Sequence, residues 1–297
     1  MTDTAASPAL HGDHLAPLAP SRPPLTAVRR VGILYQTKRL EVIALAREVE
    51  QFLRARDVEV IAGAITLEEQ IVCQELDLFV TIGGDGTMLR AAHCAARWRT
   101  PLLGINMGRL GFLTECGPAD WQATLSAVLR HDWWLEQRCM LSTQLDGVEG
   151  TTEALNDVVL ARGARPRAIH VDLAIDGVRV DELVADAVIV ATPTGSTAYA
   201  MAAGGPVLDP RMEGLAFVPV AAHLSVPGPM VLPSSSRISL RSTRDISAVL
   251  SVDGQIDLPV SMGQTVEIRA SRLRCLFART RPPEVFYGTL VTRLRRK

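Results

Sequence analysis

The segment DLFVTIGGDGTM, residues 77–88, decides how this chain folds. Residues 77–82 form the apolar, β-prone run that is typical of a buried strand. Glycines surround Asp85 directly after it, and the alanine-rich residues 89–98 predict a helix. A strand that runs through a glycine turn into a helix is the unit from which α/β sheets are built. The segment therefore predicts a parallel sheet with a glycine loop at the end of one strand.

The segments on both sides of this loop continue the alternation. Short apolar runs alternate with stretches whose apolar residues recur every three or four positions, which favours helices with one buried face. We expect a parallel sheet with helices on both faces. The predicted strands are residues 31–35, 58–62, 77–82 and 101–105, and the predicted helices are residues 40–56, 89–98 and 118–130.

After about residue 133 the pattern changes to short strands separated by Gly, Pro or Ser. Asp146-Gly147 and Asp176-Gly177 are hairpin turn signals, so this half is predicted to be mainly β. Its strands include residues 169–175, 187–191, 237–242, 246–252, 264–270 and 273–278. We expect a disordered tail over residues 1–27, an α/β domain over 28–132, a β-rich domain over 133–280, and a C-terminal segment, 281–297, that returns to the first domain.

Composition narrows the possible functions. The chain has 297 residues, of which 47% are hydrophobic, and a formal net charge of -1. The apolar content rules out disorder of the whole chain, and the near-neutral charge gives no electrostatic footprint of a nucleic-acid binder. No apolar run approaches the roughly 18–20 residues of a membrane span, and the first residues lack the features of a secretory signal. We therefore expect a cytoplasmic protein with no membrane or nucleic-acid partner.

The glycine loop at residues 83–87 suits an anion, because its backbone N–H groups and the following helix N-terminus both favour negative charge. It matches neither the P-loop nor the G-x-G-x-x-G dinucleotide pattern. Asp85 would repel a phosphate unless it binds a metal or accepts a proton, which makes it a candidate catalytic group. The alternative is an ordinary glycine turn with Asp85 as the helix N-cap.

A second polar loop follows the predicted strand 187–191. Residues 191–210 place Thr192, Thr194, Ser196 and Thr197 around a proline and a glycine, with Tyr199 next. Such a loop offers donors to a phosphate or a ribose, and a tyrosine ring can stack on a base. Alternatively, the hydroxyl groups are satisfied within the loop itself.

Three acidic positions are weaker candidates. Asn156-Asp157 interrupts an apolar run, where polar groups need hydrogen-bond partners. Such a pair can bind a nucleoside, but a strand-edge turn explains it as well. Asp186 and Asp253, each taken alone, fit a turn or a cap better than a ligand contact.

Taken together, the motifs resemble the NAD kinase family. The resemblance rests on GGDGT, GINMGRLGFLTE (104–115), LNDVV (155–159), TPTGSTAY with AGGP, and VDGQ, in this order, and it covers the chain from about residue 29 onward. It implies a doubly wound α/β nucleotide-binding domain followed by an all-β domain, with the active site in the cleft between them. It also implies an enzyme that phosphorylates NAD with ATP and Mg²⁺, in a homodimer or homotetramer.

The family's site residues fall on positions of this sequence. Asp85 would accept the proton of the 2′-hydroxyl of the adenosine ribose, and that oxygen would attack the γ-phosphate of ATP. No protein ligands for the metal are assigned, and Arg90 or Arg109 would be the nearest cation to the phosphates. Ala202 stands where many relatives have Ser. The implied binding residues are Gly83, Gly84, Gly86, Asn156, Asp157, Arg167, Asp186, Thr197, Ala198, Tyr199, Ala202 and Gln255.

Two other functions stay open at this point. One is a dinucleotide-binding module without turnover, although a pure binder gains nothing from a carboxylate beside phosphates. The other is a GGDG kinase that acts on a lipid or a sugar, although no membrane-facing patch is visible in the sequence.

Overall fold

A computed structural model describes residues 21, 27–37, 39–64, 76–108, 111–164, 167–223, 228–244 and 247–295. Most of the predicted tail lies outside these residues. Ser21 is an exception, because it exchanges two backbone hydrogen bonds with Leu135 (3.2 and 2.9 Å). The elements in chain order are β1 (Arg30–Tyr35), α1 (Leu40–Arg54), β2 (Glu59–Ala64), β3 (Leu78–Gly83), α2 (Asp85–Trp98), β4 (Leu102–Asn106), α3 (Trp121–Leu129), β5 (Trp134–Leu145), β6 (Thr152–Ala154), β7 (Asp157–Arg162), β8 (Ile169–Ile175), β9 (Val178–Ala185), β10 (Ala187–Ala191), η1 (Gly195–Thr197), α4 (Tyr199–Ala202), β11 (Gly214–Val220), β12 (Met230–Pro233), β13 (Arg237–Ser242), β14 (Ala248–Val252), β15 (Ile256–Val260), β16 (Thr265–Arg279) and α5 (Val285–Leu294).

The first part is the predicted parallel sheet. Its strands lie in the order β2-β1-β3-β4, and the pairs β1–β2, β1–β3 and β3–β4 are all parallel. Val49 of α1 and Leu125 of α3 pack into one core with one face of the sheet, whereas Met88 of α2 packs with Phe79 in another. The prediction of helices on both faces of a parallel sheet is confirmed.

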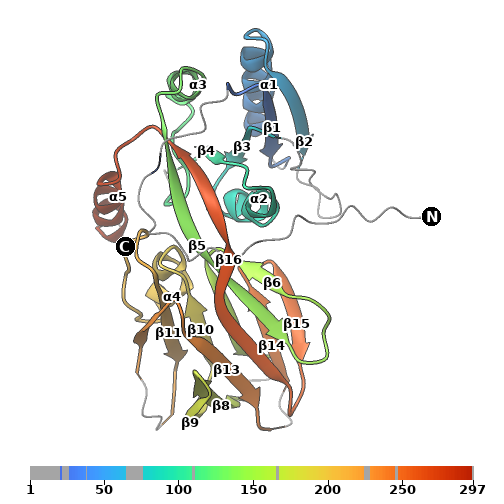
Figure 1. Ribbon diagram of the computed structural model, residues 1–297, viewed down its shortest axis with the longest axis vertical. Helices are drawn as coiled ribbons and strands as arrows, with labels where there is room; N and C mark the ends of the chain where they lie inside the picture. Colours follow the sequence, from blue (N-terminus) through green and yellow to red (C-terminus); the bar gives the residue numbers. More distant parts are fainter. Residues whose placement is uncertain are drawn as a thin grey trace, which may run out of the picture.

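Two long strands carry this sheet into the second part (Figure 1). β16 lies beside β4, with Phe277 opposite Leu102, and pairs antiparallel with β5 over most of its length. The sequence predicts two strands here, residues 264–270 and 273–278, and this is wrong. The chain continues through a register shift between Ala270 and Arg274, so one bulged strand serves both halves.

The remaining strands form a β sandwich. β13, β8 and β9 extend the first sheet, and a second, antiparallel sheet has the order β12-β11-β10-β7-β14-β15. Buried side chains such as Leu173, Phe217 and Ile268 fill the space between the two sheets. Ala200 of α4 packs on the other face of the second sheet with Ile189 and Val218. The prediction of a β-rich second half is confirmed.

The C-terminal helix α5 contacts both halves. The Phe286 ring lies 6.2 Å from the ring of Phe112, between β4 and α3. The Tyr287 hydroxyl donates to Asp209, in the loop after α4, at 2.6 Å.

No described helix is long and apolar enough to cross a membrane. The odd number and wide spacing of the cysteines predict buried free thiols without a disulfide framework. This is wrong for Cys94, which is disulfide-bonded, whereas Cys116, Cys139 and Cys275 are buried free thiols.

Phe277→Ala tests whether the two halves fold as one unit. Phe277 is fully buried on β16, so the cavity should cost about 3–5 kcal/mol of unfolding free energy. All four tryptophans precede residue 135, so their fluorescence reports the α/β side, whereas circular dichroism reports the whole chain. In urea both signals should shift together, with the exposed-site variant Val148→Ala as control. Two separate transitions would contradict the shared-strand account.

Candidate active site

The carboxylate of Asp85 is held by backbone donors from a distant loop. β3 ends at Gly83 and Gly84 is the N-cap of α2, so Asp85 is the first residue of the helix. Its side chain does not cap the helix, as the alternative interpretation required. It accepts hydrogen bonds from the backbone N–H groups of Phe112 (3.1 Å) and Leu113 (3.2 Å). Asp85 is half-buried.

The glycines around Asp85, three in its own loop and Gly111 in the loop that holds its carboxylate, are required for different structural reasons. A Cβ at Gly83 would collide with Thr87, and one at Gly111 would collide with the Asp85 carboxylate itself. Gly84 and Gly86 are exposed, and no atom lies within 4 Å of where their Cβ would stand. The first two glycines permit close packing, whereas the other two leave room for a ligand to approach the backbone.

Buried hydroxyl groups of the loop after β10 form hydrogen bonds with backbone groups of the protein. The Thr192 hydroxyl donates to the Leu155 carbonyl (2.6 Å) and accepts from the Gly195 N–H (3.1 Å). The Ser196 hydroxyl donates to the Pro193 carbonyl at 2.6 Å. Both side chains are fully buried, so the expectation that they face a ligand is wrong. Ser196 is satisfied within the loop, as the alternative required, whereas Thr192 also bonds to Leu155 outside it. Thr197 and Ala198 are half-buried and Tyr199 and Ala202 are exposed, so this end of the loop remains available.

Asp253 organises the Asn156-Asp157 segment. One of its carboxylate oxygens accepts from the N–H groups of Asn156 (2.7 Å) and Asp157 (3.1 Å), and the other from Leu155 (2.8 Å). The second oxygen also lies 2.7 Å from Nε2 of His93 on α2. The sequence identifies Asp253 only as a turn residue, which it is. Its partners lie about a hundred positions earlier, and no local pattern indicates them.

Gly195 brings the two polar loops together. A Cβ at this position would overlap the backbone of Asn156. The Thr192 N–H also donates to the Asn156 carbonyl at 2.8 Å. The structure therefore places Asn156 and Asp157 directly beside the loop that carries Thr197 to Tyr199.

Asp157 is a buried carboxyl with a perturbed charge state. Its exposed fraction is 6%. Burial, and then the negative charge of Asp253, raise its pKa from 3.8 to about 7. Near neutral pH this group can therefore hold a proton and donate a hydrogen bond, which an ordinary aspartate cannot do.

The other predicted positions are more scattered. Gln255 is exposed in the β14–β15 turn, two residues from Asp253. Asp186 precedes β10 and pairs with Arg162 at 3.2 Å, at the opposite end of β10 from Thr192. Arg167 is exposed beyond the same end of β7. Within this chain, Asp186 and Arg167 therefore lie at the other end of the strands from Asn156 and do not form one site with it. Arg90 is exposed on α2, and Arg109 lies outside the described residues.

A glycine loop with one oriented carboxylate at the end of a parallel strand, in the same molecule as a polar loop from a β-rich half, is typical of a nucleotide-binding α/β protein. Residues 63–133 match the ATP-NAD kinase N-terminal domain, and residues 155–280 match the ATP-NAD kinase C-terminal domain. The chain belongs to the ATP-NAD kinase family, as the sequence resemblance predicted.

Similarity to individual proteins supports the same family assignment. The chain is 38% identical to an NAD kinase of Chloroflexus aggregans over 91% of its own length and 99% of the relative's. It is 39% identical to an NAD kinase of Thermococcus kodakarensis, over 84% and 94%. Its fold is similar to that of an Archaeoglobus fulgidus NAD kinase in complex with ATP, with a TM-score of 0.72, 27% identity and coverage of 88% of this chain and 98% of that one. A yeast NADH kinase complexed with NADH has a TM-score of 0.76 at 23% identity, covering 90% and 87%.

Asp157→Asn should change how stability depends on pH. Below about pH 3 the carboxyl is mostly protonated in both states. Between about pH 4 and pH 7 the unfolded chain loses this proton while the folded chain keeps it, so the unfolding free energy falls as pH rises. The variant lacks this loss, so its advantage over the parent should grow from near zero at about pH 3 to a few kcal/mol at about pH 8.

Urea titrations at several pH values measure this difference. Asp132→Asn, which alters an exposed carboxyl, is the control and should run parallel to the parent. An advantage of Asp157→Asn that is independent of pH would show that the Asp157 carboxyl is not perturbed.

Proposed function

We propose that this protein is an NAD kinase, which transfers the γ-phosphate of ATP to the 2′-hydroxyl of the adenosine ribose of NAD and so makes NADP. The observation that carries the proposal is the Asp85 carboxylate, oriented by two backbone N–H groups inside an exposed glycine loop. Membership of the ATP-NAD kinase family supports it. Relatives named NAD kinase match most of the chain at 38% and 39% identity.

Asp85 has the chemistry of a proton acceptor. The Phe112 and Leu113 N–H groups hold this carboxylate in one orientation beside the exposed Gly84 and Gly86, and an ionised carboxylate can accept a proton from a substrate hydroxyl. As the carboxylate takes the proton of the 2′-hydroxyl, the ribose oxygen forms a bond to the γ-phosphorus. The bond between that phosphorus and the bridging oxygen breaks, and ADP leaves. The protein contributes mainly orientation and charge.

The remaining predicted residues are proposed to bind substrate. Asn156 and Asp157 lie beside the loop that ends in Thr197, Ala198 and Tyr199, which suits contacts to a nucleoside. A protonated Asp157 can donate to a base or ribose oxygen. The exposed backbone of Gly84 and Gly86 suits phosphate oxygens. Roles for Gly83, Arg167, Asp186, Ala202 and Gln255 remain expectations from the resemblance.

The divalent metal is proposed to arrive with ATP. Among the described residues no three His, Cys, Asp or Glu side chains are grouped as a metal site. Mg²⁺ commonly keeps several waters and takes other ligands from substrate phosphates, so an ion that arrives with ATP needs no group of protein ligands. The metal would offset charge on the phosphates. A cytoplasmic location and a homodimer or homotetramer are proposed on the sequence and the resemblance alone.

Asp85→Asn tests the proton acceptor. The amide keeps the size of the side chain but cannot take a proton, so NADP formation should fall by about 10²–10⁴-fold. NAD binding, measured by calorimetry, should change little. The control Asp132→Asn should keep parental turnover. Near-parental turnover of Asp85→Asn would exclude Asp85 as the base, and a parent that makes no NADP from NAD, ATP and Mg²⁺ would contradict the proposed function itself.

Gly111→Ala tests the position of the same carboxylate. A methyl group here must displace the Asp85 side chain, and a shift of about 1 Å can cost about a hundredfold in rate. We expect kcat to fall by about that factor while the melting temperature stays within a few degrees. Gly117→Ala is the matched control, because nothing lies within 4 Å of its Cβ position. Equal activities of the two variants would show that the close approach of Gly111 is unimportant.

A further inference from the structure

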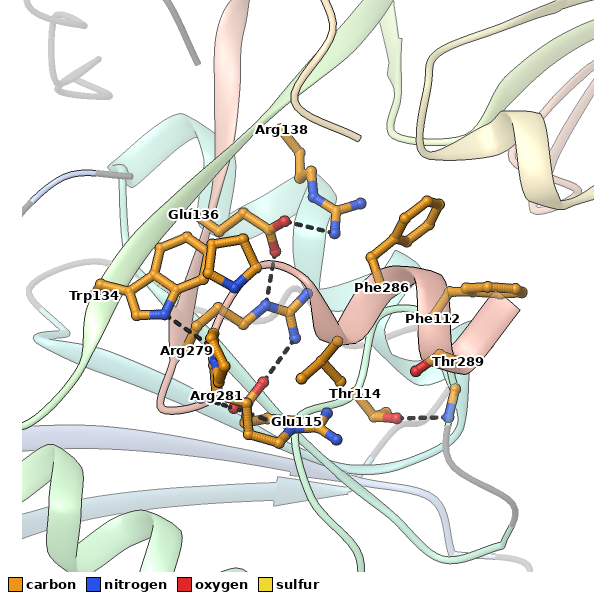
Figure 2. Close-up of a pocket in the computed structure, with 14 residues that line it drawn as sticks. Phe112, Thr114, Glu115, Trp134, Glu136, Arg138, Arg279, Arg281, Phe286 and Thr289 are labelled. Carbon is orange, nitrogen blue, oxygen red and sulfur yellow. Dashed lines mark hydrogen bonds and ion pairs between the residues drawn. The ribbon is translucent and has the colours of Figure 1, made fainter. Parts of the chain in front are cut away.

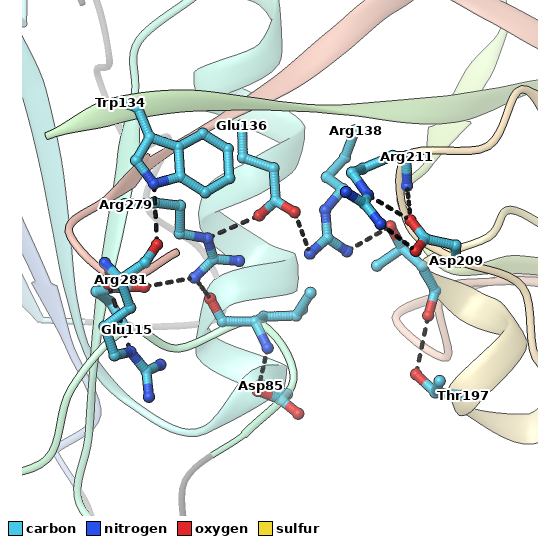
Figure 3. Close-up of polar contacts among 12 residues, drawn as sticks. Asp85, Glu115, Trp134, Glu136, Arg138, Thr197, Asp209, Arg211, Arg279 and Arg281 are labelled. Carbon is cyan, nitrogen blue, oxygen red and sulfur yellow. Dashed lines mark hydrogen bonds and ion pairs between the residues drawn. The ribbon is translucent and has the colours of Figure 1, made fainter. Parts of the chain in front are cut away.

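Three buried charged side chains form a row (Figure 3). The row lies between the loop that holds the Asp85 carboxylate and the polar loop after β10. They are Arg279 on β16 and Glu136 and Arg138 on β5, and we call them the charged row. Arg279 Nε donates to Glu136 Oε2 at 2.7 Å, and Arg138 Nη2 lies 2.8 Å from Glu136 Oε1. Glu136 therefore holds one arginine with each of its oxygens.

One end of the charged row meets the loop that orients Asp85. Arg279 Nη1 donates to the Leu113 carbonyl at 2.9 Å, and the Leu113 N–H donates to Asp85 at 3.2 Å. The same nitrogen lies 3.2 Å from Glu115, whose other oxygen accepts from the Thr280 N–H at 2.9 Å. Residue 113 is therefore fixed through its carbonyl while its N–H fixes the proton acceptor.

The other end meets the loop after β10. Arg138 Nη1 donates to the Thr194 hydroxyl at 3.1 Å. The Thr194 carbonyl in turn accepts from the Thr197 hydroxyl, also at 3.1 Å. A continuous path of hydrogen bonds and ion pairs thus joins Asp85 to the segment proposed to contact the nucleoside.

The charged row is not itself a substrate pocket. It lines a cavity of about 50 Å³ between β5, β16 and α5 (Figure 2). Ligand sites measure roughly 300–1,000 Å³, so this space is too small for a nucleotide. Phe286 and Thr289 of α5 also line it. The side chains are nearly inaccessible, with exposed fractions of 7% for Glu136, 4% for Arg138 and 7% for Arg279.

Stability alone gives little reason for such a row. Buried ion pairs rarely stabilise a fold more than apolar side chains of equal volume, because each charge loses its hydration. Their best-attested use is to specify one geometry. Here that geometry ends at the two loops that the proposed reaction needs.

We propose that Glu136, Arg138 and Arg279 are positioning residues, which fix the separation between the Asp85 carboxylate and the loop of residues 194–199. This rests on the proposed kinase function. None of the three touches substrate. Their effect on the rate comes from holding the base and the ribose in reacting geometry.

Arg138 variants test the inference, because Glu136 keeps Arg279 as a partner when Arg138 is lost. In Arg138→Met we expect kcat for NADP formation to fall by about 10–100-fold, with KM for NAD changed by less than about threefold. In Arg138→Lys the single ammonium can pair with Glu136 but cannot also reach Thr194 in the same geometry. This variant should keep the parental melting temperature and still lose kcat.

A double-mutant cycle separates positioning from loss of structure. If Arg138 acts through Thr194, then Thr194→Val lowers kcat similarly, and the double variant with Arg138→Lys is no worse than either single variant. Arg274→Met is the matched control, because Arg274 is also a buried arginine of the β5–β16 pair, bound to Glu213 at 2.8 Å. Its kcat should stay within about threefold of the parent.

Each outcome either supports or overturns the positioning role. Parental kcat in Arg138→Lys and Thr194→Val, additive losses in the cycle, or an equal loss in Arg274→Met would overturn the positioning role, whether or not Arg138→Met folds. All of these comparisons use an active parent. A parent without kinase activity would instead contradict the proposed function, so the two failures are distinguishable.

Discussion

The pairing of β5 with β16 is the interaction on which the rest of this structure depends. It carries one sheet from the α/β half into the sandwich, with Phe277 beside β4 and Val266 opposite Leu145 at the far end. A strand ladder is stiff because backbone hydrogen bonds between the two strands recur along its whole length. Asp85 and Asn156 belong to different halves, so only a stiff connection can keep them in a constant relation. A hinged linker between two separate domains would allow the distance between Asp85 and Asn156 to vary.

Two aspartates show how the same chemistry serves two purposes. Asp85 and Asp253 each accept backbone N–H groups from a loop far away in sequence, and charge-assisted bonds of this kind are stronger than neutral ones. The Asp253 side chain is completely buried and uses both oxygens to hold Leu155, Asn156 and Asp157. Asp85 is half-buried beside exposed glycines. Complete burial makes Asp253 a structural group, whereas the partial exposure of Asp85 puts its carboxylate where a substrate can approach it.

Local patterns predicted what depends on neighbours in sequence. The alternation around residues 77–88 gives the parallel sheet, and the change of period near residue 133 gives the β half, because side-chain spacing reflects which faces are buried. The merging of 264–270 and 273–278 into β16 was missed, since pairing with β5 decides it. Asp85 was identified because a carboxylate among glycines is chemically unusual. The hydrogen bonds of Asp253 and the charged row were not predicted, because the partners lie far away along the chain and the spacing of residues does not indicate them.

The charged row is not equally firm along its length. Burial opposes ionisation of Glu136, but Arg138 and Arg279 outweigh it and lower its pKa to about 2. Burial lowers the pKa of Arg138, which has one carboxylate partner, whereas Glu136 and Glu115 outweigh burial at Arg279 and raise its pKa. The end that orients Asp85 is therefore held by two carboxylates. The end at Thr194 has one carboxylate and a neutral hydroxyl, so fewer ionic contacts hold the loop that the nucleoside would approach.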